Sequence, residues 1–330
     1  MKRREFIGMA AAAAVAPMVM PEVLRASVRP DASSVKIRRA PKPQVVYKSP
    51  HGKPNALQAT PTGMWVQDQG PDNWVSFINY ADGKVIREFQ VDMNQASGIT
   101  IDADGIMWHN STHDSTIIKT NQQDGKVIAK YWCHGAGRIY SMKGDPAGSR
   151  STLKPAYPSP ARGGGAAAAG EGGAPAAGAG RAGGGGRGGG RGGGAGMAPG
   201  QIAFEPNSRD PRLGLGGTGG HGMENRDGLL YFAVPPARMV YVVDPKTWQV
   251  QDAWATAGNR PHGVAWDPGG DSLWVSDSNH RAFFRHDVKT GNIIEKIQLA
   301  EDDPIIHGVT FHDGYMWFCD DVGWVANFKL

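Results

Sequence analysis

Short apolar stretches, separated by turns rich in Gly and Asp, fill most of the chain beyond residue 43. The segment from 260 to 299 shows the arrangement clearly, because β-branched and aromatic residues gather in four short runs there. Runs of about four to eight such residues, bounded by Asp-Gly or Thr-Gly turns, are typical of β-strands. The pattern predicts four strands in this segment: His262–Trp266, Ser272–Ser276, Ala282–Asp287 and Ile293–Leu299.

The same unit recurs along the chain. An aromatic residue of its second strand marks each copy: Trp65, Trp108, Tyr231, Trp274 and Trp317. The interval is 43 residues from 65 to 108, from 231 to 274 and from 274 to 317. Periods of about 40–45 residues with four short strands are typical of propeller blades. We expect the four tryptophans to lie in the cores of the blades.

Five units can be counted, and the last ends at Leu330 after only three strands. The segment 43–49, PQVVYKS, has a strand pattern and is in phase to supply the missing strand. Closing the ring in this way would remove an exposed sheet edge. The sequence therefore predicts an all-β fold, a β-propeller over 43–330 with five four-stranded blades closed by the N-terminal strand. Six blades are the alternative.

A long insertion separates the second and third units. From Trp108 to Tyr231 the interval is 123 residues, far above the period of 43. Part of it, 159–200, contains 20 glycines among 42 residues, a composition that cannot bury enough apolar area to offset the entropy of ordering. We expect 140–217 to be an insertion within the propeller, with 159–200 as a disordered low-complexity segment. A degenerate sixth blade is the other interpretation.

The first 26 residues have the pattern of a twin-arginine export signal. Arg3 and Arg4 precede an apolar run without charge from Phe6 to Met20, which is the arrangement of such a signal. We expect 1–26 to engage the twin-arginine translocase and the protein to be periplasmic or secreted, with an uncleaved membrane anchor as the alternative. Residues 27–42 are expected to be an N-terminal linker.

Charge and cysteine content narrow the range of partners. The formal net charge is +4; the first 26 residues carry +2 and the segment 159–200 carries +3, so −1 is left for the rest. A body without a basic surface is a poor match for nucleic acid. Cys133 and Cys319 define neither a disulfide framework nor a thiolate metal site, and we expect both in strands. A monomer that binds a small molecule or a periplasmic protein is expected.

The blade architecture predicts where polar residues converge. The first strand of a blade is the innermost, and the second returns to the same mouth of the channel. Two residues per blade should therefore meet there. The first strands begin near Asn55, Ser97, His221, His262 and His307, and the second strands end at Asp68, Ser111, Val234, Asp277 and Asp320.

Imidazole and carboxylate groups at one mouth have two chemical uses. They are suitable ligands for a divalent metal ion, Mg or Ca with Zn as a further option, and the expected ligands are His221, His262, His307, Asp277 and Asp320. A histidine oriented by a carboxylate is also a general base near neutral pH. Asn55, Asp68, Ser97 and Ser111 are expected to line the mouth as substrate contacts.

A structural interpretation stands beside the chemical one. The His-Gly pair can hold a neighbouring blade, with glycine permitting a close approach, and the Asp residues can cap the turns that follow them. Five further histidines are expected on the surface or in turns: His51, His134, His280, His286 and His312.

The phrases PHGVAWDPGGDSLWVSDS and HGVTFHDGYMWFCDD resemble the repeats of the virginiamycin B (streptogramin) lyase group. They are more loosely similar to the SMP-30/gluconolactonase and NHL/YVTN propellers. The resemblance covers roughly 43–135 and 219–330 and implies a propeller fold. For activity it implies a Mg-assisted elimination that opens a cyclic depsipeptide. It assigns catalytic roles to His262 and His307.

Two positions depart from the lyase pattern. Asp320 lies where the family has a glutamate, and Ile305 lies where it has another. The metal-binding Pro-Asn-Gly of the gluconolactonases reads Pro261-His262-Gly263 in this chain.

Two functions follow as hypotheses. The first is an exported, metal-dependent enzyme of lyase or lactonase type that acts on a cyclic ester or related small molecule, with His307 as general base. The 140–217 insertion would then emerge at the histidine-bearing mouth as a lid. The second is a non-catalytic propeller that binds a protein or small-molecule ligand in the periplasm. Bound metal would distinguish them.

Overall fold

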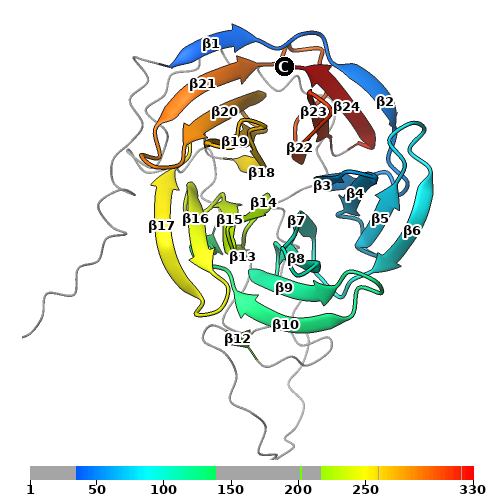
Figure 1. Cartoon of the computed structure of the whole chain (residues 1–330), viewed down its shortest axis with the longest axis vertical. Coiled ribbons are helices and arrows are strands. Elements are labelled where there is room, and N and C mark those ends of the chain that lie inside the picture. Colours follow the sequence, from blue (N-terminus) through cyan, green and yellow to red (C-terminus); the bar gives the residue numbers. More distant parts are fainter. Residues whose placement is uncertain (1–34, 139–200, 203–216, 259, 321) are drawn as a thin grey trace, which may run out of the picture.

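The computed structural model describes residues 35–138, 201–202, 217–258, 260–320 and 322–330. These residues form an all-β propeller of five blades around a central axis, as Figure 1 shows. The prediction of five blades is confirmed. In the described part of the chain, no helix has the length and apolar character needed to cross a bilayer. The predicted export signal 1–26 and the low-complexity segment 159–200 lie outside the described residues.

Each blade is an antiparallel sheet whose first strand lies nearest the axis. Blade 1 contains β3 (Pro54–Thr60), β4 (Gly63–Asp68), β5 (Trp74–Ile78) and β6 (Val85–Gln90). Blade 2 contains β7 (Ala96–Ile101), β8 (Ile106–Ser111), β9 (Thr116–Asn121) and β10 (Val127–Trp132). Blade 3 contains β14 (Met223–Arg226), β15 (Leu229–Val234), β16 (Met239–Asp244) and β17 (Gln249–Ala255).

Blade 4 tests the strand predictions most directly. It contains β18 (Pro261–Trp266), β19 (Ser272–Asp277), β20 (Ala282–Asp287) and β21 (Ile293–Gln298). All four expected strands form, and no boundary differs by more than one residue. Such agreement is expected where the strand pattern, the turn residues and the repeat all indicate the same structure.

Blade 5 is closed by the N-terminal part of the chain, as predicted. Its strands β22 (Val309–His312), β23 (Tyr315–Cys319) and β24 (Trp324–Lys329) are completed by β2 (Gln44–Lys48). β2 pairs antiparallel with β24, with Gln44 opposite Asn327 and Lys48 opposite Trp324. The ring is thus joined by hydrogen bonds between its first and last strands.

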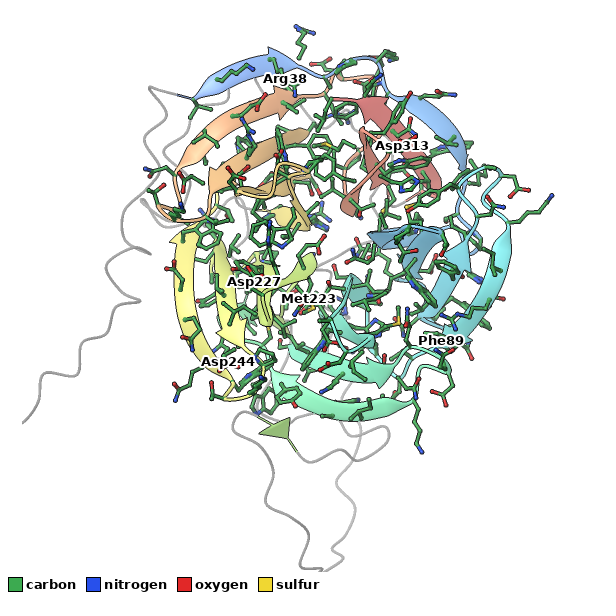
Figure 2. The ribbon with its side chains drawn as sticks, viewed as in Figure 1. Arg38, Phe89, Met223, Asp227, Asp244 and Asp313 are labelled. Atoms are coloured by element: carbon green, nitrogen blue, oxygen red, sulfur yellow. The ribbon has the colours of Figure 1, made fainter. Side chains whose placement is uncertain are left out.

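Two blades gain a fifth strand that the repeat pattern does not indicate. β1 (Lys36–Arg39), within the expected linker, pairs parallel with β21 on the outside of blade 4. Figure 2 labels Arg38 on this strand, at the periphery of the ring. On blade 2, β12 (Gln201–Ile202) pairs antiparallel with β10. Both additions cover an outer edge that would otherwise expose unpaired backbone groups.

The two ends of the insertion pair with each other. β11 (Gly137–Arg138) pairs antiparallel with β13 (Gly217–Thr218). Behind this pair, Gly219 N donates to Thr112 O over 2.7 Å, and the Thr112 hydroxyl donates to Gly220 O over 3.2 Å. His221, which starts the innermost part of blade 3, therefore follows directly after the end of the insertion in the chain.

The hydrophobic core is divided among the interfaces between neighbouring blades. The four marker tryptophans, Trp65, Trp108, Trp274 and Trp317, are all buried, as predicted. Trp274, for example, packs with Phe283 of its own blade and with Phe318 of blade 5. Cys319 ends β23 and Cys133 follows β10 directly, and both thiols are buried.

Candidate functional site at the channel axis

The structure brings together the five residues predicted at the starts of the first strands. They form one axial ring: Asn55, Ser97, His221, His262 and His307. Contacts run around this ring from blade to blade. Asn55 Nδ2 donates to Ser97 Oγ over 2.8 Å, and Ser97 Oγ lies 3.0 Å from His221 Nδ1. His221 and His262 face each other with their Nδ1 atoms 3.4 Å apart.

The ring continues by stacking. The imidazoles of His262 and His307 lie nearly parallel, with 4.3 Å between their centroids and 22° between their planes. All five side chains of the axial ring are at most 2% exposed. The ring therefore fills the axis of the propeller where the five innermost strands begin.

Glycine after the axial residue makes this close approach feasible. A Cβ on Gly98 would lie 1.9 Å from the carbonyl oxygen of His221, and one on Gly222 would lie 2.1 Å from that of His262. A Cβ on Gly263 would lie 2.6 Å from the carbonyl oxygen of His307. The first strands of neighbouring blades thus touch backbone to backbone. The repeated His-Gly pair supplies the imidazole that fills the axis and the glycine that admits the next strand.

Burial keeps the axial imidazole of His262 neutral. Burial lowers the pKa of His262 well below its usual range, and the neighbouring His307, His221 and Arg260 lower it further.

The residues at the ends of the second strands accept hydrogen bonds from backbone N–H groups of the loops. Asp277 accepts from Arg260 N and His280 N, each over 2.9 Å. Asp320 accepts from Val322 N over 3.0 Å and from Trp324 N over 2.8 Å. These carboxylates cap the turns that follow them, as the structural interpretation predicted.

The early blades use the same position in the same way. Asp68 accepts from Lys53 N and Gly70 N, each over 2.6 Å. The Ser111 hydroxyl accepts from Asn94 N over 2.8 Å. The repeat thus places a loop-capping acceptor at this position in four of the five blades, and Val234 occupies it in the third.

The predicted metal-binding set is not assembled. Over the described ranges of the chain, no group of three or more His, Cys, Asp or Glu side chains is arranged to hold a metal ion. His221 and His262 face each other, but Asp277 and Asp320 are committed to backbone N–H groups elsewhere. The arrangement as it stands does not fit the predicted five-ligand set, because three imidazoles meet in the axial ring whereas the hydrogen bonds given above hold Asp277 and Asp320 against their loops.

Sequence reasoning missed two buried titratable groups and one contact of a third, His280. Glu224 on β14 is buried, and burial raises its pKa to about 8, against the opposing hydrogen bonds of Asn225 and Thr100. His109 on β8 is buried, and burial lowers its pKa to about 3. His280, expected in a turn, lies in one, but its Nδ1 is 3.2 Å from Asp277 Oδ1. An isolated titratable residue within a strand pattern gives no sequence signal of this kind.

One histidine was predicted wrongly. His286 was expected on the surface or in a turn, but it is fully buried on β20. Its Nδ1 lies 3.1 Å from Gly291 O, and burial lowers its pKa to about 4. The alternation of the strand, which places every second residue against the neighbouring blade, accounts for the burial.

Comparisons with known proteins support the fold. No protein-family model matches the chain, and no curated protein matches it. Among solved structures, it is similar to a glutaminyl cyclase from Myxococcus xanthus, with 7% identity, a TM-score of 0.53, and coverage of 89% of this chain and 97% of that one. A catalytically inactive virginiamycin B lyase from Staphylococcus aureus with quinupristin matches with 14% identity, a TM-score of 0.41, and coverage of 86% and 68%. At these identities the likeness concerns the propeller fold alone.

Proposed function

We propose that the protein is an exported five-bladed propeller that binds a small molecule or a periplasmic protein at its rim, without catalysis at the axis. The observation that carries this proposal is the burial of the axial ring. A general base must reach the proton that it abstracts, and no side chain of the ring is more than 2% exposed. The imidazoles instead contact one another and hold the innermost strands together.

The loop-capping aspartates support the same conclusion. A carboxylate that accepts two backbone N–H groups is held against its own loop by charge-assisted hydrogen bonds. Asp277 and Asp320 are each in this state. The export part of the proposal rests on the Arg3-Arg4 pattern and the uncharged run that follows it.

A metal-dependent lyase or lactonase is the second candidate, and one distance favours it. The Nδ1 atoms of His221 and His262 are 3.4 Å apart. Two nitrogens bound to one tetrahedral ion at about 2.1 Å each would have about this separation. The same distance fits a single hydrogen bond between two neutral imidazoles, which is how the first proposal interprets it.

Metal content separates the two candidates. The mature chain, purified without chelator, is compared with the double variant His262→Ala/His307→Ala and screened for turnover of lactones and cyclic esters. The first proposal expects no stoichiometric metal, no turnover, and a lower melting temperature for the double variant. One divalent ion per chain that is lost in the double variant, together with turnover, would overturn it in favour of the second.

Ligand binding gives the positive test. A thermal-shift screen of small molecules identifies a ligand, whose Kd is then measured for the wild type and for His262→Gln, which keeps a polar side chain in the axial ring. The proposal expects the same Kd for both proteins, because the ligand binds at the rim. A Kd weakened tenfold or more in His262→Gln, with unchanged melting, would place the ligand at the axis instead.

A further inference from the structure

A strand from the N-terminal part of the chain covers the outer edge of blade 4. β1 pairs parallel with β21, from Lys36 opposite Glu295 to Arg39 opposite Gln298. Among the residues that the structure describes, no strand covers the outermost strands of blades 1 and 3, which are β6 and β17. A blade of this propeller therefore forms without such a cover, and β1 is an addition to a complete four-stranded sheet.

A buried carboxylate lies under β1. The Glu295 side chain is only 5% exposed and contacts two guanidinium groups: Arg38 Nε of β1 donates to it over 2.7 Å, and Arg285 Nη2 of β20 lies 2.9 Å from it. Charge-assisted hydrogen bonds to a carboxylate are roughly twice as strong as neutral ones. Arg285 belongs to blade 4 itself, so it orients the carboxylate independently of β1.

This arrangement is specific to blade 4. The residues equivalent to Glu295 in blades 1 to 3, aligned by the bulge in each outer strand, are Arg87, Ala129 and Asp252. The residue opposite Glu295 on β20 is Arg285, whereas the residue opposite Asp252 on β16 is Val242. Of these four outer strands, as far as the structure describes them, only β21 has a carboxylate with an arginine of its own blade opposite it.

Lys296, the next residue along β21, does not pair with Glu295. Its Nζ makes no hydrogen bond with any described residue and lies 5.6 Å from the centroid of the Phe284 ring. The equivalent lysine of blade 2, Lys130, forms an ion pair with Asp92 over 3.4 Å. Neighbouring strand residues point to opposite faces of a sheet, so the carboxylate of Glu295 remains available to a cation on an added strand.

β1 is held by polar contacts, whereas β2 is held by packing. Ile37 of β1 is 41% exposed, and the Arg38 side chain is 31% exposed although it contacts Glu295. In β2, Tyr47 packs against the buried apolar cluster that contains Trp317. Elements with few buried apolar contacts open at a lower free energy than the core. We therefore expect β1 to detach while β2 keeps the ring closed.

A fixed point separates the two strands. Lys42 Nζ lies 2.8 Å from Asp302 Oδ2 and 2.8 Å from Asp303 Oδ1. These contacts hold the chain just before β2 begins at Gln44. Release of residues 35–40, called the strap below, can therefore end at Lys42 without opening the ring.

We propose that the outer edge of blade 4 is a docking site for a basic extended segment of a partner protein, and that the strap occupies it reversibly in the free protein. The docked segment runs parallel to β21 as a fifth strand, with an arginine on Glu295 in the place of Arg38. In strand addition, main-chain hydrogen bonds give affinity and side chains give specificity. The site lies at the periphery of the ring (Figure 2), and it does not rest on the proposed function.

Releasing the strap is the first test. Arg38→Glu in the full chain places a second carboxylate beside Glu295, and we expect amide hydrogen exchange of the strap to rise at least about tenfold. The reporter is the Ala40 amide, which donates to Gln298 O over 2.8 Å. Exchange at Ser49, whose amide is hydrogen-bonded to the loop before β24, should stay unchanged, as should the melting temperature. Unchanged exchange at Ala40, or equal acceleration at Ser49, would overturn the proposal.

A peptide supplied in trans tests the docking itself. A fluorescent peptide with the sequence VKIRRAPKP, that of residues 35–43, is titrated against the full chain and followed by fluorescence anisotropy. We expect it to bind the Arg38→Glu variant at least about tenfold more tightly than the wild type, in which the strap occupies the edge. The same peptide with the change Arg38→Glu should not bind. Equal affinity for the variant and the wild type would contradict the proposal.

Matched variants locate the docked peptide. The double variant Arg38→Glu/Glu295→Gln should bind the peptide several-fold more weakly than Arg38→Glu alone. Arg38→Glu/Asp252→Asn, which changes the equivalent carboxylate of blade 3, should bind it as tightly as Arg38→Glu alone. Equal binding by all three variants would place the peptide elsewhere and remove the site. Light scattering of the wild type tests the other occupant: a dimer that is lost in Glu295→Gln would identify β1 of a second copy as the docked segment, and would overturn the assignment to a partner protein.

Discussion

The early and late blades solve the same packing problem at the axis in opposite ways. In blades 1 and 2 the axial ring residue is small, Asn55 or Ser97, and the second strand carries a long amide two residues after the marker tryptophan, Gln67 or Asn110. In blades 3 to 5 the axial ring residue is a histidine, and the equivalent second-strand residues are small. These small residues are Ala233, Ser276 and Cys319.

The difference shows that the side chains of the two innermost strands of a blade fill the space near the axis together. Where one side chain is large, the other is small, and the hydrogen bond to the next blade is adjusted accordingly. Gln67 Nε2 donates to Gly98 O of the next blade over 3.0 Å, and Asn110 donates in the same way to His221 O. In blade 4 the shorter Ser276 donates to His307 O over 2.8 Å. Blade 3 has no polar group there, and Gly222 N donates directly to His262 O. Blades 1 to 4 thus each reach the backbone of the next blade, with whichever group fits beside the axial residue.

The largest expected effect comes from closing the space between two first strands. In Gly98→Ala, the new Cβ would overlap the carbonyl oxygen of His221 at 1.9 Å, so the blade 2–blade 3 contact must separate. We expect a loss of about 3 kcal/mol or more in the free energy of unfolding, measured by urea denaturation.

Gly314→Ala is the matched control. Gly314 has a φ of +76° and nothing within 4 Å of an added Cβ, so only backbone strain of about 1 kcal/mol is expected. If both variants lose the same stability, the close approach of the first strands does not hold the ring together.

Much of this architecture can be predicted from the sequence, because the same strand and turn pattern recurs in each copy of the repeat. The marker tryptophans, the Asp-Gly turns and the lone segment 43–49 together give five blades and the closing strand β2. The first-strand starts also predict which residues meet at the axis, since the innermost strands of a propeller converge there.

The remaining features depend on side-chain orientations and strand additions that the spacing of residues in the repeat does not determine. Asp277 and Asp320 lie at the predicted mouth, but whether a carboxylate faces the axis or caps its own loop depends on a side-chain rotamer. β1 and β12 join blades 4 and 2 as short outer strands with no repeat signal. Lys296 and Lys130 follow the same local pattern, and only the three-dimensional structure distinguishes the unpaired amine from the paired one.

Acid pH provides a second test, with an effect of intermediate size. Burial lowers the pKa of His109 to about 3, so the folded state keeps this imidazole neutral while the unfolded chain binds a proton below about pH 6.5. The unfolded state then binds more protons, and stability falls as the pH falls from 6.5. The expected loss is about 1.4 kcal/mol per pH unit for each such histidine.

The variant His109→Gln sharpens the comparison between early and late blades. It should reduce the slope of unfolding free energy against pH between 5 and 6 by about one proton, since His109 of blade 2 titrates alone. His221→Asn should act through His262, because His221 is one of the groups that lower the pKa of His262. Equal slopes for the wild type and His109→Gln would show that this imidazole is already protonated in the folded state.

The smallest effects concern the side chains that reach from one blade to the next. Asn110→Ala removes the donor to His221 O in a buried place, and we expect a loss of about 1–3 kcal/mol because that carbonyl loses a partner. Ser276→Ala removes the bond to His307 O, but it leaves almost no cavity, so about 1 kcal/mol is expected. Urea denaturation of both single variants and of the double variant measures the difference.

Because Asn110 and Ser276 act on different pairs of blades, the two losses should add within about 0.5 kcal/mol. A double variant that loses clearly more than the sum would mean that the early and late halves of the ring stabilise each other through the axial ring, and the two halves would then have to be treated as one cooperative unit.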